Sequence, residues 1–283
     1  MLSPISLGYF PPATDLRSHI SYYYVFRANV PRISDVMRAD VAQLRFMIGG
    51  QGHYSFGNGL TLPTPDVCLV GPTTAATRFT VEGPVLVFGM GILPAGWARM
   101  VRDDAASHAD RVEDAVAMFG PPLADALNRM REARTEPELF DIADRTMRWL
   151  SRRAGEPPLW FTQLTDSWLT GQANPSVDWL VAESGLSARH VERLARRFYG
   201  APPKLLARKY RALRAASLLG AGERPWSDPL NQPFYDQSHL IREFKRFTGL
   251  TPGQLERSPP PIARLSRQRR ALAGLAPEIA VVS

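Results

Sequence analysis

The feature of this sequence that most constrains its fold is an internal repeat in the C-terminal half. Residues 187–208 (SARHVERLARRFYGAPPKLLAR) align without a gap with residues 236–257 (DQSHLIREFKRFTGLTPGQLER), 49 positions later (236 − 187). A chance match would not keep so many residues in register, so the repeat predicts a duplicated structural unit. The identical pairs are His190/His239, Arg193/Arg242, Arg197/Arg246, Phe198/Phe247, Gly200/Gly249, Pro203/Pro252, Leu206/Leu255 and Arg208/Arg257.

Each copy of the repeat predicts an amphipathic helix with marked ends. In the second copy, Asp236 is suited to cap the first turn, and Gly249 to adopt the left-handed conformation after the last turn. Leu240, Phe244 and Phe247 fall within one narrow arc of the helix, and the basic residues gather on the opposite side. Each unit therefore combines a capped helix, a glycine stop and a proline that starts a new helix.

The positive charge of the chain is concentrated in its second half. Residues 1–150 hold 14 Arg and no Lys against 16 acidic residues, a net charge of −2. Residues 151–283 hold the remaining 20 basic residues (34 − 14) against 11 acidic ones (27 − 16), a net charge of +9. Clustered Lys and Arg predict a polyanionic partner, either a nucleic acid or a membrane surface.

Two further features bear on the compartment and on covalent chemistry. The sequence has no run of about 18 apolar residues, and its first residues lack a basic start followed by an apolar core, so we expect a cytoplasmic protein without a membrane partner. The single cysteine, Cys68, excludes an intramolecular disulfide and fits a reducing compartment. Its apolar context, DVCLV, favours a buried small hydrophobe over a nucleophile.

Turn signals and periodicity divide the chain into regions. Residues 20–100 contain short β-branched and aromatic runs separated by GGQG, GNG, PTP and EGP, which predict the short strands of a sandwich or barrel. The pattern becomes helical from about residue 103, and Gly155, Pro157 and Pro158 mark a boundary. We therefore predict a β-rich domain (1–102), a helical linker (103–158), an all-α domain (159–258) and a Pro- and Arg-rich, poorly ordered tail (259–283).

Two helix-turn-helix units joined by a long helix resemble the DNA-binding domain of the AraC/XylS family of bacterial transcription regulators. The resemblance covers about residues 160–257, and its most specific stretch is YDQSHLIREFKRFTGLTP. It implies that the second helix of each unit enters the major groove, in two successive turns of the duplex about 34 Å apart. The implied helix pairs are Ser176–Glu183 with Arg189–Phe198, and the segment before Phe234 with Gln237–Phe247.

The resemblance also implies roles for residues on the outer side of the two reading helices. Arg can contact guanine in a bidentate way, Gln can contact adenine, and Glu can accept a hydrogen bond from cytosine. Phosphate contacts set the register without reading the sequence. The expected base contacts are Arg189, Glu192, Arg193, Gln237, Ser238 and Arg242, and the expected phosphate contacts are Arg196, Lys245 and Arg246.

The second unit departs from the family pattern. Asp228 and Pro229 stand where an Ile-Ala pair is usual, and Pro233 stands where a Gly usually precedes the reading helix. Because prolines remove donors and disfavour a full supporting helix, we expect this unit to dock imperfectly or to contribute mostly phosphate contacts. In the first unit, Val181 at a position where Ala is usual is a lesser departure.

For the N-terminal region, the resemblance implies a cupin-like β-barrel that senses a ligand or mediates dimerisation. It rests on the arrangement and on GMGILPAGWARMV, and it makes the chain an α+β protein. The five His residues contain no H-x-H pair, so we expect no metal and no cofactor, with His53 as a turn or strand residue. Tyr22, Tyr23, Tyr24 and Trp97 either pack in the core or line an apolar pocket.

These observations leave three classes of function. The leading one is a sequence-specific transcription regulator, a ligand-responsive activator in this family, with double-stranded DNA, RNA polymerase, a small-molecule effector and a second copy of the chain as partners. The second is an enzyme, either of the cupin type or one that transfers alkyl groups from DNA, but the latter needs an activated cysteine that the surroundings of Cys68 do not offer. The third is a non-specific binder of nucleic acid or of a membrane surface, driven only by the charge of the second half. We therefore expect no enzymatic activity.

Overall fold

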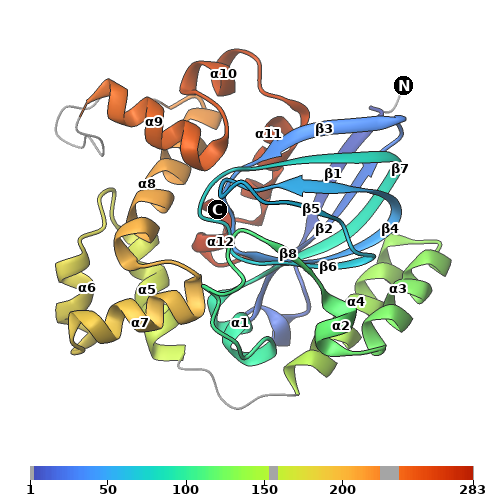
Figure 1. Cartoon of the computed structure of the whole chain (residues 1–283), viewed down its shortest axis with the longest axis horizontal. Coiled ribbons are helices and arrows are strands. Elements are labelled where there is room, and N and C mark those ends of the chain that lie inside the picture. Colours follow the sequence, from blue (N-terminus) through green and yellow to red (C-terminus); the bar gives the residue numbers. More distant parts are fainter. Residues whose placement is uncertain (1–2, 153–158, 224–235, 283) are drawn as a thin grey trace.

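The computed structural model describes residues 3–152, 159–223 and 236–282, which form a β-sheet domain followed by a helical domain (Figure 1). This confirms the predicted α+β fold, with a mainly-β N-terminal part and an all-α C-terminal part. The strands are β1 (Ile5–Phe10), β2 (Ile20–Ala28), β3 (Arg32–Met37), β4 (Ala42–Ser55), β5 (Thr61–Pro63), β6 (Val67–Val70), β7 (Thr77–Ile92) and β8 (Val112–Asp114).

All eight strands belong to one antiparallel sheet. Its order is β1-β2-β7-β4-β6-β8, and β3 and β5 pair with β7 and β4, respectively. Because side chains alternate along a strand, the two faces of the sheet differ in β4. Leu44 and Phe46 pack in one apolar cluster, whereas Met47 belongs to another. The predicted strand position of His53 is confirmed, since this residue lies in β4 opposite Thr80.

One face of the sheet is covered by helices of the same domain. A short 3-10 turn, η1 (Thr14–Leu16), and helices α1 (Pro94–Met100), α2 (Ala115–Phe119), α3 (Pro122–Glu132) and α4 (Glu136–Ser151) contribute to this packing. Strand β8, however, lies within the range that we expected to be a helical linker. It pairs with β6, so the sheet extends as far as Asp114 before the helices begin.

The helical domain contains the predicted repeat. Its helices are α5 (Leu159–Gly171), α6 (Val177–Ser184), α7 (Ala188–Tyr199), α8 (Pro203–Gly220), α9 (Gln237–Thr248) and α10 (Pro252–Arg257). Helices α7 and α9 lie on one side of the molecule, with α8 between them (Figure 1). No helix among the residues placed by the structure is both long enough and apolar enough to cross a bilayer.

The ends of the two reading helices confirm the predicted caps. Ser187 accepts a hydrogen bond from the backbone N–H of His190 at the start of α7, and Asp236 accepts one from His239 at the start of α9. The last turns end at Gly200 and Gly249, with φ of 77° and 76°. The helix predicted over Ser176–Glu183 corresponds to α6. Asp228, Pro229 and Pro233, and the predicted boundary at Gly155–Pro158, lie outside the described residues.

The C-terminal segment differs from the expected poorly ordered tail. It forms α11 (Pro261–Leu265), the 3-10 helix η3 (Ser266–Leu272) and α12 (Glu278–Val282). Leu272, Ile279 and Val282 are buried, so these apolar side chains order a segment whose composition is rich in Pro and Arg. Segments α11 and η3 contact the β-domain, and α12 contacts α5 and α8 of the helical domain.

Candidate nucleic-acid interface and cavity

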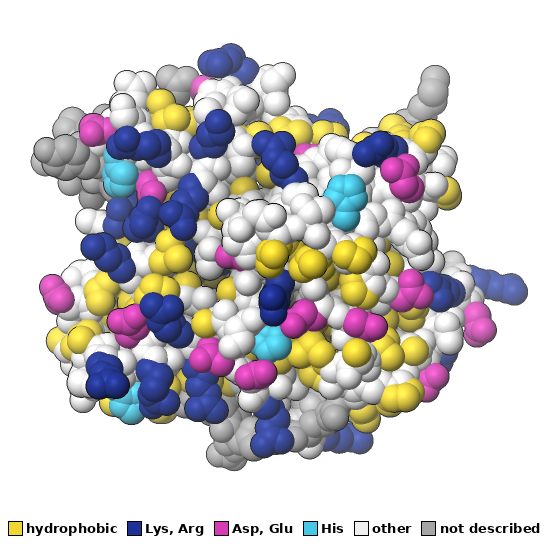
Figure 2. All heavy atoms as spheres, viewed as in Figure 1, with side chains coloured by type: hydrophobic (Ala, Val, Ile, Leu, Met, Phe, Trp, Pro, Cys, Tyr) yellow, Lys and Arg dark blue, Asp and Glu magenta, His cyan; other side chains and the backbone are white. Residues whose placement is uncertain are grey.

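Helices α7 and α9 present the residues that we expected to contact DNA. All nine predicted contact residues are exposed: Arg189, Glu192, Arg193 and Arg196 on α7, and Gln237, Ser238, Arg242, Lys245 and Arg246 on α9. Lys and Arg side chains gather over these helices in Figure 2. Exposure permits contact with DNA, and the individual roles stay predictions.

Side-chain contacts along α7 organise part of this surface. Glu192 forms an ion pair with Arg196, with 2.9 Å between Oε1 and Nη2. Arg193 Nη2 lies 2.7 Å from His190 Nε2. The opposite side of the helix is anchored by Val191 and Phe198, which are buried. The apolar side of α7 is therefore packed in the protein interior, and its polar side faces solvent.

A partly buried ion pair connects α9 to α8. The guanidinium of Arg208 donates two hydrogen bonds to Glu243, at 2.7 and 2.8 Å. Burial alone would raise the pKa of Glu243, but Arg208 holds it below its ordinary value. Glu243 is only 5% exposed, so loss of Arg208 would leave its carboxylate buried without a cation, whereas the Arg208 side chain is partly exposed. No local pattern in the sequence indicates this pair, although Arg208 belongs to the repeat.

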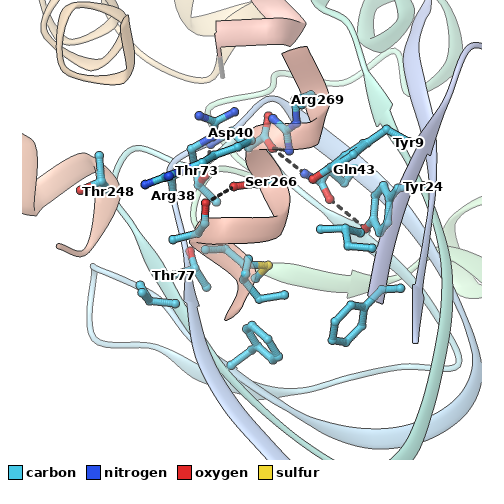
Figure 3. A pocket seen from close by; sticks show the side chains of 18 of the residues that line it. Tyr9, Tyr24, Arg38, Asp40, Gln43, Thr73, Thr77, Thr248, Ser266 and Arg269 are labelled. Atoms are coloured by element: carbon cyan, nitrogen blue, oxygen red, sulfur yellow. Dashed lines mark hydrogen bonds and ion pairs between the residues drawn. The ribbon is translucent and has the colours of Figure 1, made fainter. Parts of the chain in front are cut away.

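A cavity of about 150 Å³ lies between the sheet and the helical domain (Figure 3). Both domains and the C-terminal segment form its wall. Its apolar part includes Leu7, Phe26, Met47, Phe79, Val81 and Val87 from the sheet, and Ala216, Leu250, Leu255 and Ile262 from the helices. A cavity of similar size in another protein admits benzene, so this one is large enough for a small organic molecule.

A network around Asp40 forms the polar end of the cavity (Figure 3). Its carboxylate accepts hydrogen bonds from Arg269 at 3.0 Å, Gln43 at 2.9 Å and Tyr22 at 3.2 Å. Burial would raise the pKa of Asp40, but the nearby cations, chiefly Arg269, keep it below its ordinary value. The Arg269 guanidinium also lies over the Tyr22 ring, 4.5 Å from its centroid. This network joins the sheet to the C-terminal segment.

Arg45 is a second buried cation in the cavity wall. It is 7% exposed and donates to Gln43 Oε1 at 2.7 and 3.0 Å and to the Tyr54 hydroxyl at 2.7 Å. Burial raises the pKa of Tyr54, so this hydroxyl is neutral near pH 7. Within the part of the chain that the structure describes, no carboxylate forms an ion pair with Arg45. Among the residues that the structure describes, the charged side chains of the lining are Arg38, Arg45, Arg267, Arg269 and Arg270 against one acid, Asp40.

A partial signal for this site is present in the pattern of β4. Gln43 and Arg45 alternate with Leu44 and Phe46, so two polar side chains share one face of an otherwise apolar strand. Of the four aromatic residues that we considered for a pocket, Tyr24 lines the cavity. The others, Tyr22, Tyr23 and Trp97, are fully buried core residues.

The remaining candidates for chemistry are not activated. Cys68 is buried, as predicted, and burial raises the pKa of its thiol to about 12. Such a thiol is a poor nucleophile near pH 7. Among the described residues, His, Cys, Asp and Glu form no group of three that could hold a metal ion.

Comparisons with known proteins agree with the helical domain. A family model described as a helix-turn-helix domain matches residues 180–258, which run from α6 through α10. No curated protein sequence matches this chain.

Several solved structures match this chain at low sequence identity and low TM-score. ToxT from Vibrio cholerae O395 is 12% identical, with a TM-score of 0.44, covering 79% of this chain and 96% of that one. ToxT from V. cholerae strain SCE256 bound to an unsaturated fatty acid is 11% identical, with a TM-score of 0.45, covering 90% and 96%. The AraC-like transcriptional activator CuxR is 15% identical, with a TM-score of 0.32, covering 74% and 80%.

Proposed function

We propose that this chain, whose C-terminal part is an AraC-type helix-turn-helix domain, is a sequence-specific transcription regulator that responds to a small molecule. The observation that carries the DNA-binding role is the pair of capped helices α7 and α9, which expose basic residues at equivalent positions of the repeat. In this proposal the two helices read successive major grooves.

Base reading and phosphate binding can be separated by two substitutions. Arg193→Ala should cost about 1–3 kcal/mol at the preferred site and relax selectivity there, because a bidentate base contact is lost. Lys245→Ala should weaken binding to all sequences alike and reduce the salt slope by about one. Binding curves on a selected site and on scrambled duplex, at several salt concentrations, measure both effects. Equal losses on both duplexes for Arg193→Ala would assign this residue to phosphate instead.

The helical domain should bind DNA without the β-domain, because the repeat and the basic residues lie within it. Since α12 contacts α5 and α8, a fragment from about residue 156 should retain the C-terminal segment as well. We expect the fragment to fold and to bind DNA more weakly than the full chain, as circular dichroism and titration with duplex would show. An unfolded or DNA-inert fragment would contradict the division into domains.

The cavity is the proposed effector site, and its lining suggests the class of ligand. An apolar wall suits an apolar body, and Arg45 is a buried cation that lacks an acidic partner among the described residues. A buried charge is costly unless it is paired. An anionic head on the ligand would supply that partner, so we propose a small apolar carboxylate or a similar anion.

Hexanoate, with hexanol as its uncharged counterpart, provides a direct test. Binding to the folded state alone stabilises it by RT ln(1 + [L]/Kd), so at equal ligand concentration the tighter ligand raises the melting temperature more. Hexanoate should raise the melting temperature of the wild type more than hexanol does, and Arg45→Met should remove the difference. Equal shifts with hexanoate and hexanol in the wild type would eliminate the charge-based part of the proposal.

Activation, contact with RNA polymerase and dimerisation are proposals that rest on the family resemblance. An in vitro transcription assay with a selected promoter and purified polymerase tests the first two, with and without hexanoate. Sedimentation of the full chain tests for a homodimer. A decrease in transcript on addition of the protein would replace activation by repression and leave the DNA-binding role in place.

A further inference from the structure

Both copies of the repeat dock on the β-domain through the same position. The backbone N–H of Ala105 donates to the Arg197 carbonyl at 3.0 Å, and that of Ala76 donates to the Arg246 carbonyl at 2.8 Å. Arg197 and Arg246 are equivalent residues of the repeat (246 − 197 = 49). The last carbonyls of a helix have no partner within the helix, so the β-domain supplies donors to the ends of both α7 and α9.

The glycines after these helices bring the two domains into close contact. A Cβ atom on Gly200 would lie 2.5 Å from Pro72 Cγ, and one on Gly249 would lie 2.3 Å from Val36 Cγ2. Both glycines also have positive φ, which other residues rarely adopt. Each glycine therefore ends its helix and allows the β-domain to approach it.

The two docking sites differ in the volume of free space beside them. Beside the first unit, where Phe198 and Tyr199 of α7 meet Pro72 and Trp97, the free space is only about 10 Å³. The second unit borders the large cavity, whose lining includes Thr248 and Leu250 at the end of α9. No described residue of α6 or α7 lines that cavity.

The β-domain loops that hold the second unit also border the cavity. Ala39 donates to the Phe247 carbonyl at 2.7 Å, in addition to the contact from Ala76. Their neighbours Arg38, Asp40 and Thr77 line the cavity. A molecule in the cavity thus meets both sides of the second docking site, whereas on the side of the first it meets only Val41 and Thr73 of the β-domain, next to Pro72, and no residue of α6 or α7.

We propose that a ligand in the cavity displaces the second helix-turn-helix unit relative to the β-domain, while the first unit stays fixed. This inference rests on the proposed role of the cavity as the effector site. A ligand shifts the equilibrium between two arrangements of an interface only if it binds one of them more tightly. The interface of the first unit is closely packed and leaves no space for a second arrangement. Movement of α9 alone changes its placement relative to α7, and with it the fit to two successive grooves.

Two matched glycine substitutions in the full chain test whether the units open separately. Gly249→Ala and Gly200→Ala carry the same backbone strain, and each directs a methyl group into the β-domain. We expect Gly249→Ala to speed amide hydrogen exchange in α9 and α10 at least tenfold while α6 and α7 keep the wild-type rate. Gly200→Ala should lower the melting temperature without local acceleration in α7. The same behaviour in both variants would overturn the proposal.

A compensating substitution separates docking from helix strain. Val36→Ala removes the side chain that the methyl group of Gly249→Ala would meet, but it leaves the strained cap unchanged. In the double variant, exchange in α9 should return to within about threefold of the wild-type rate. Exchange that stays fast would assign the effect to the cap and would overturn the role of docking.

The ligand arm uses hexanoate on the wild type. We expect exchange to change at least threefold in α9 and α10 and to stay constant in α6 and α7. If the melting temperature shows binding but both units change equally, or neither does, the inference is wrong although the effector site stands. If hexanoate does not bind, the effector proposal fails for this probe, and the glycine variants still decide whether the second unit opens alone.

Discussion

The two faces of the β-sheet use the same strands for different purposes. On β4, Leu44 and Phe46 point to the face covered by α3 and α4, where both are fully buried in an apolar cluster. Gln43, Arg45 and Met47 point to the other face and line the cavity. The first face is closed by helices that follow the sheet in the sequence, and the second is closed by the helical domain.

The two faces differ in their content of buried polar groups. The helix-covered face is stabilised mainly by burial of apolar area, which needs no specific partner. The cavity face combines apolar residues with Asp40, Arg45 and Arg269, whose charges are held by hydrogen bonds: Asp40 accepts from Gln43 and Arg269, and Arg45 donates to Gln43. Such a face costs more to assemble, but it leaves space and charge for a ligand at the junction of the domains.

Removal of the Asp40 carboxylate should produce the largest loss on the cavity face. Asp40→Ala leaves Arg269 buried without its anion and should lower the free energy of unfolding by about 3–5 kcal/mol. Urea denaturation measures this loss. The control is Asp66→Ala, whose partner Arg131 lies 3.3 Å away in an exposed pair. The control should cost less than about 1 kcal/mol. A similar small loss for Asp40→Ala would show that the network contributes little.

Two truncations on β4 compare the faces directly. Leu44→Ala should lower the free energy of unfolding by about 4 kcal/mol, because this side chain is packed on all sides. Met47→Ala should cost about 2 kcal/mol, since Met47 already borders a cavity and loses fewer contacts. Denaturation of both variants under the same conditions decides the order. Equal losses would mean that the cavity face is packed as tightly as the other.

The same contrast explains what the sequence could predict. The ends of α7 and α9 depend on local signals, Ser187, Asp236 and the glycines of the repeat, so their prediction succeeded. The Asp40–Arg269 pair joins residues 229 positions apart, and no local pattern indicates it. Each residue looks like an ordinary surface charge in the sequence. The order of the C-terminal segment is hard to predict for the same reason, because its partners lie in distant strands and helices.

Lys209 makes the junction sensitive to pH. Its ammonium donates to the Asp40 carbonyl at 2.7 Å, and burial lowers its pKa to about 8. The folded state therefore releases this proton at lower pH than the unfolded state does. Lys209 therefore contributes to the free energy of unfolding at high pH. This contribution is lost as the pH falls through the pKa that Lys209 has in the folded state. From about pH 7 to about pH 9.5, the wild type should gain about 2 kcal/mol relative to Lys209→Met.

The measurement is a series of urea denaturations of both proteins across this pH range. Groups other than Lys209 titrate alike in the two proteins, so the difference between the curves isolates the lysine. A difference that shrinks as pH rises would reverse the sign and would mean that the folded state favours the charged form. The Asp66→Ala protein should follow the wild type, because Asp66 lies in an exposed pair with Arg131, outside the junction.

The smallest effect is expected at Cys68, whose neighbours on β6 again separate the two faces. Cys68 packs in the cluster that borders the cavity, whereas Leu69 packs in the cluster beneath α3 and α4. The Cys68 thiol is fully buried, donates to the Pro65 carbonyl at 3.0 Å and has its pKa raised to about 12 by burial. Both burial and the scarcity of thiolate should slow alkylation by iodoacetamide, on the order of a thousandfold relative to free cysteine. In concentrated urea the rate should approach that of free cysteine.

The matched variant Cys68→Ala/Leu69→Cys moves the thiol to the other face, where we expect still slower alkylation because only global unfolding exposes it. Faster alkylation at position 69 than at position 68 would show that the helix-covered face, and not the cavity face, opens more readily.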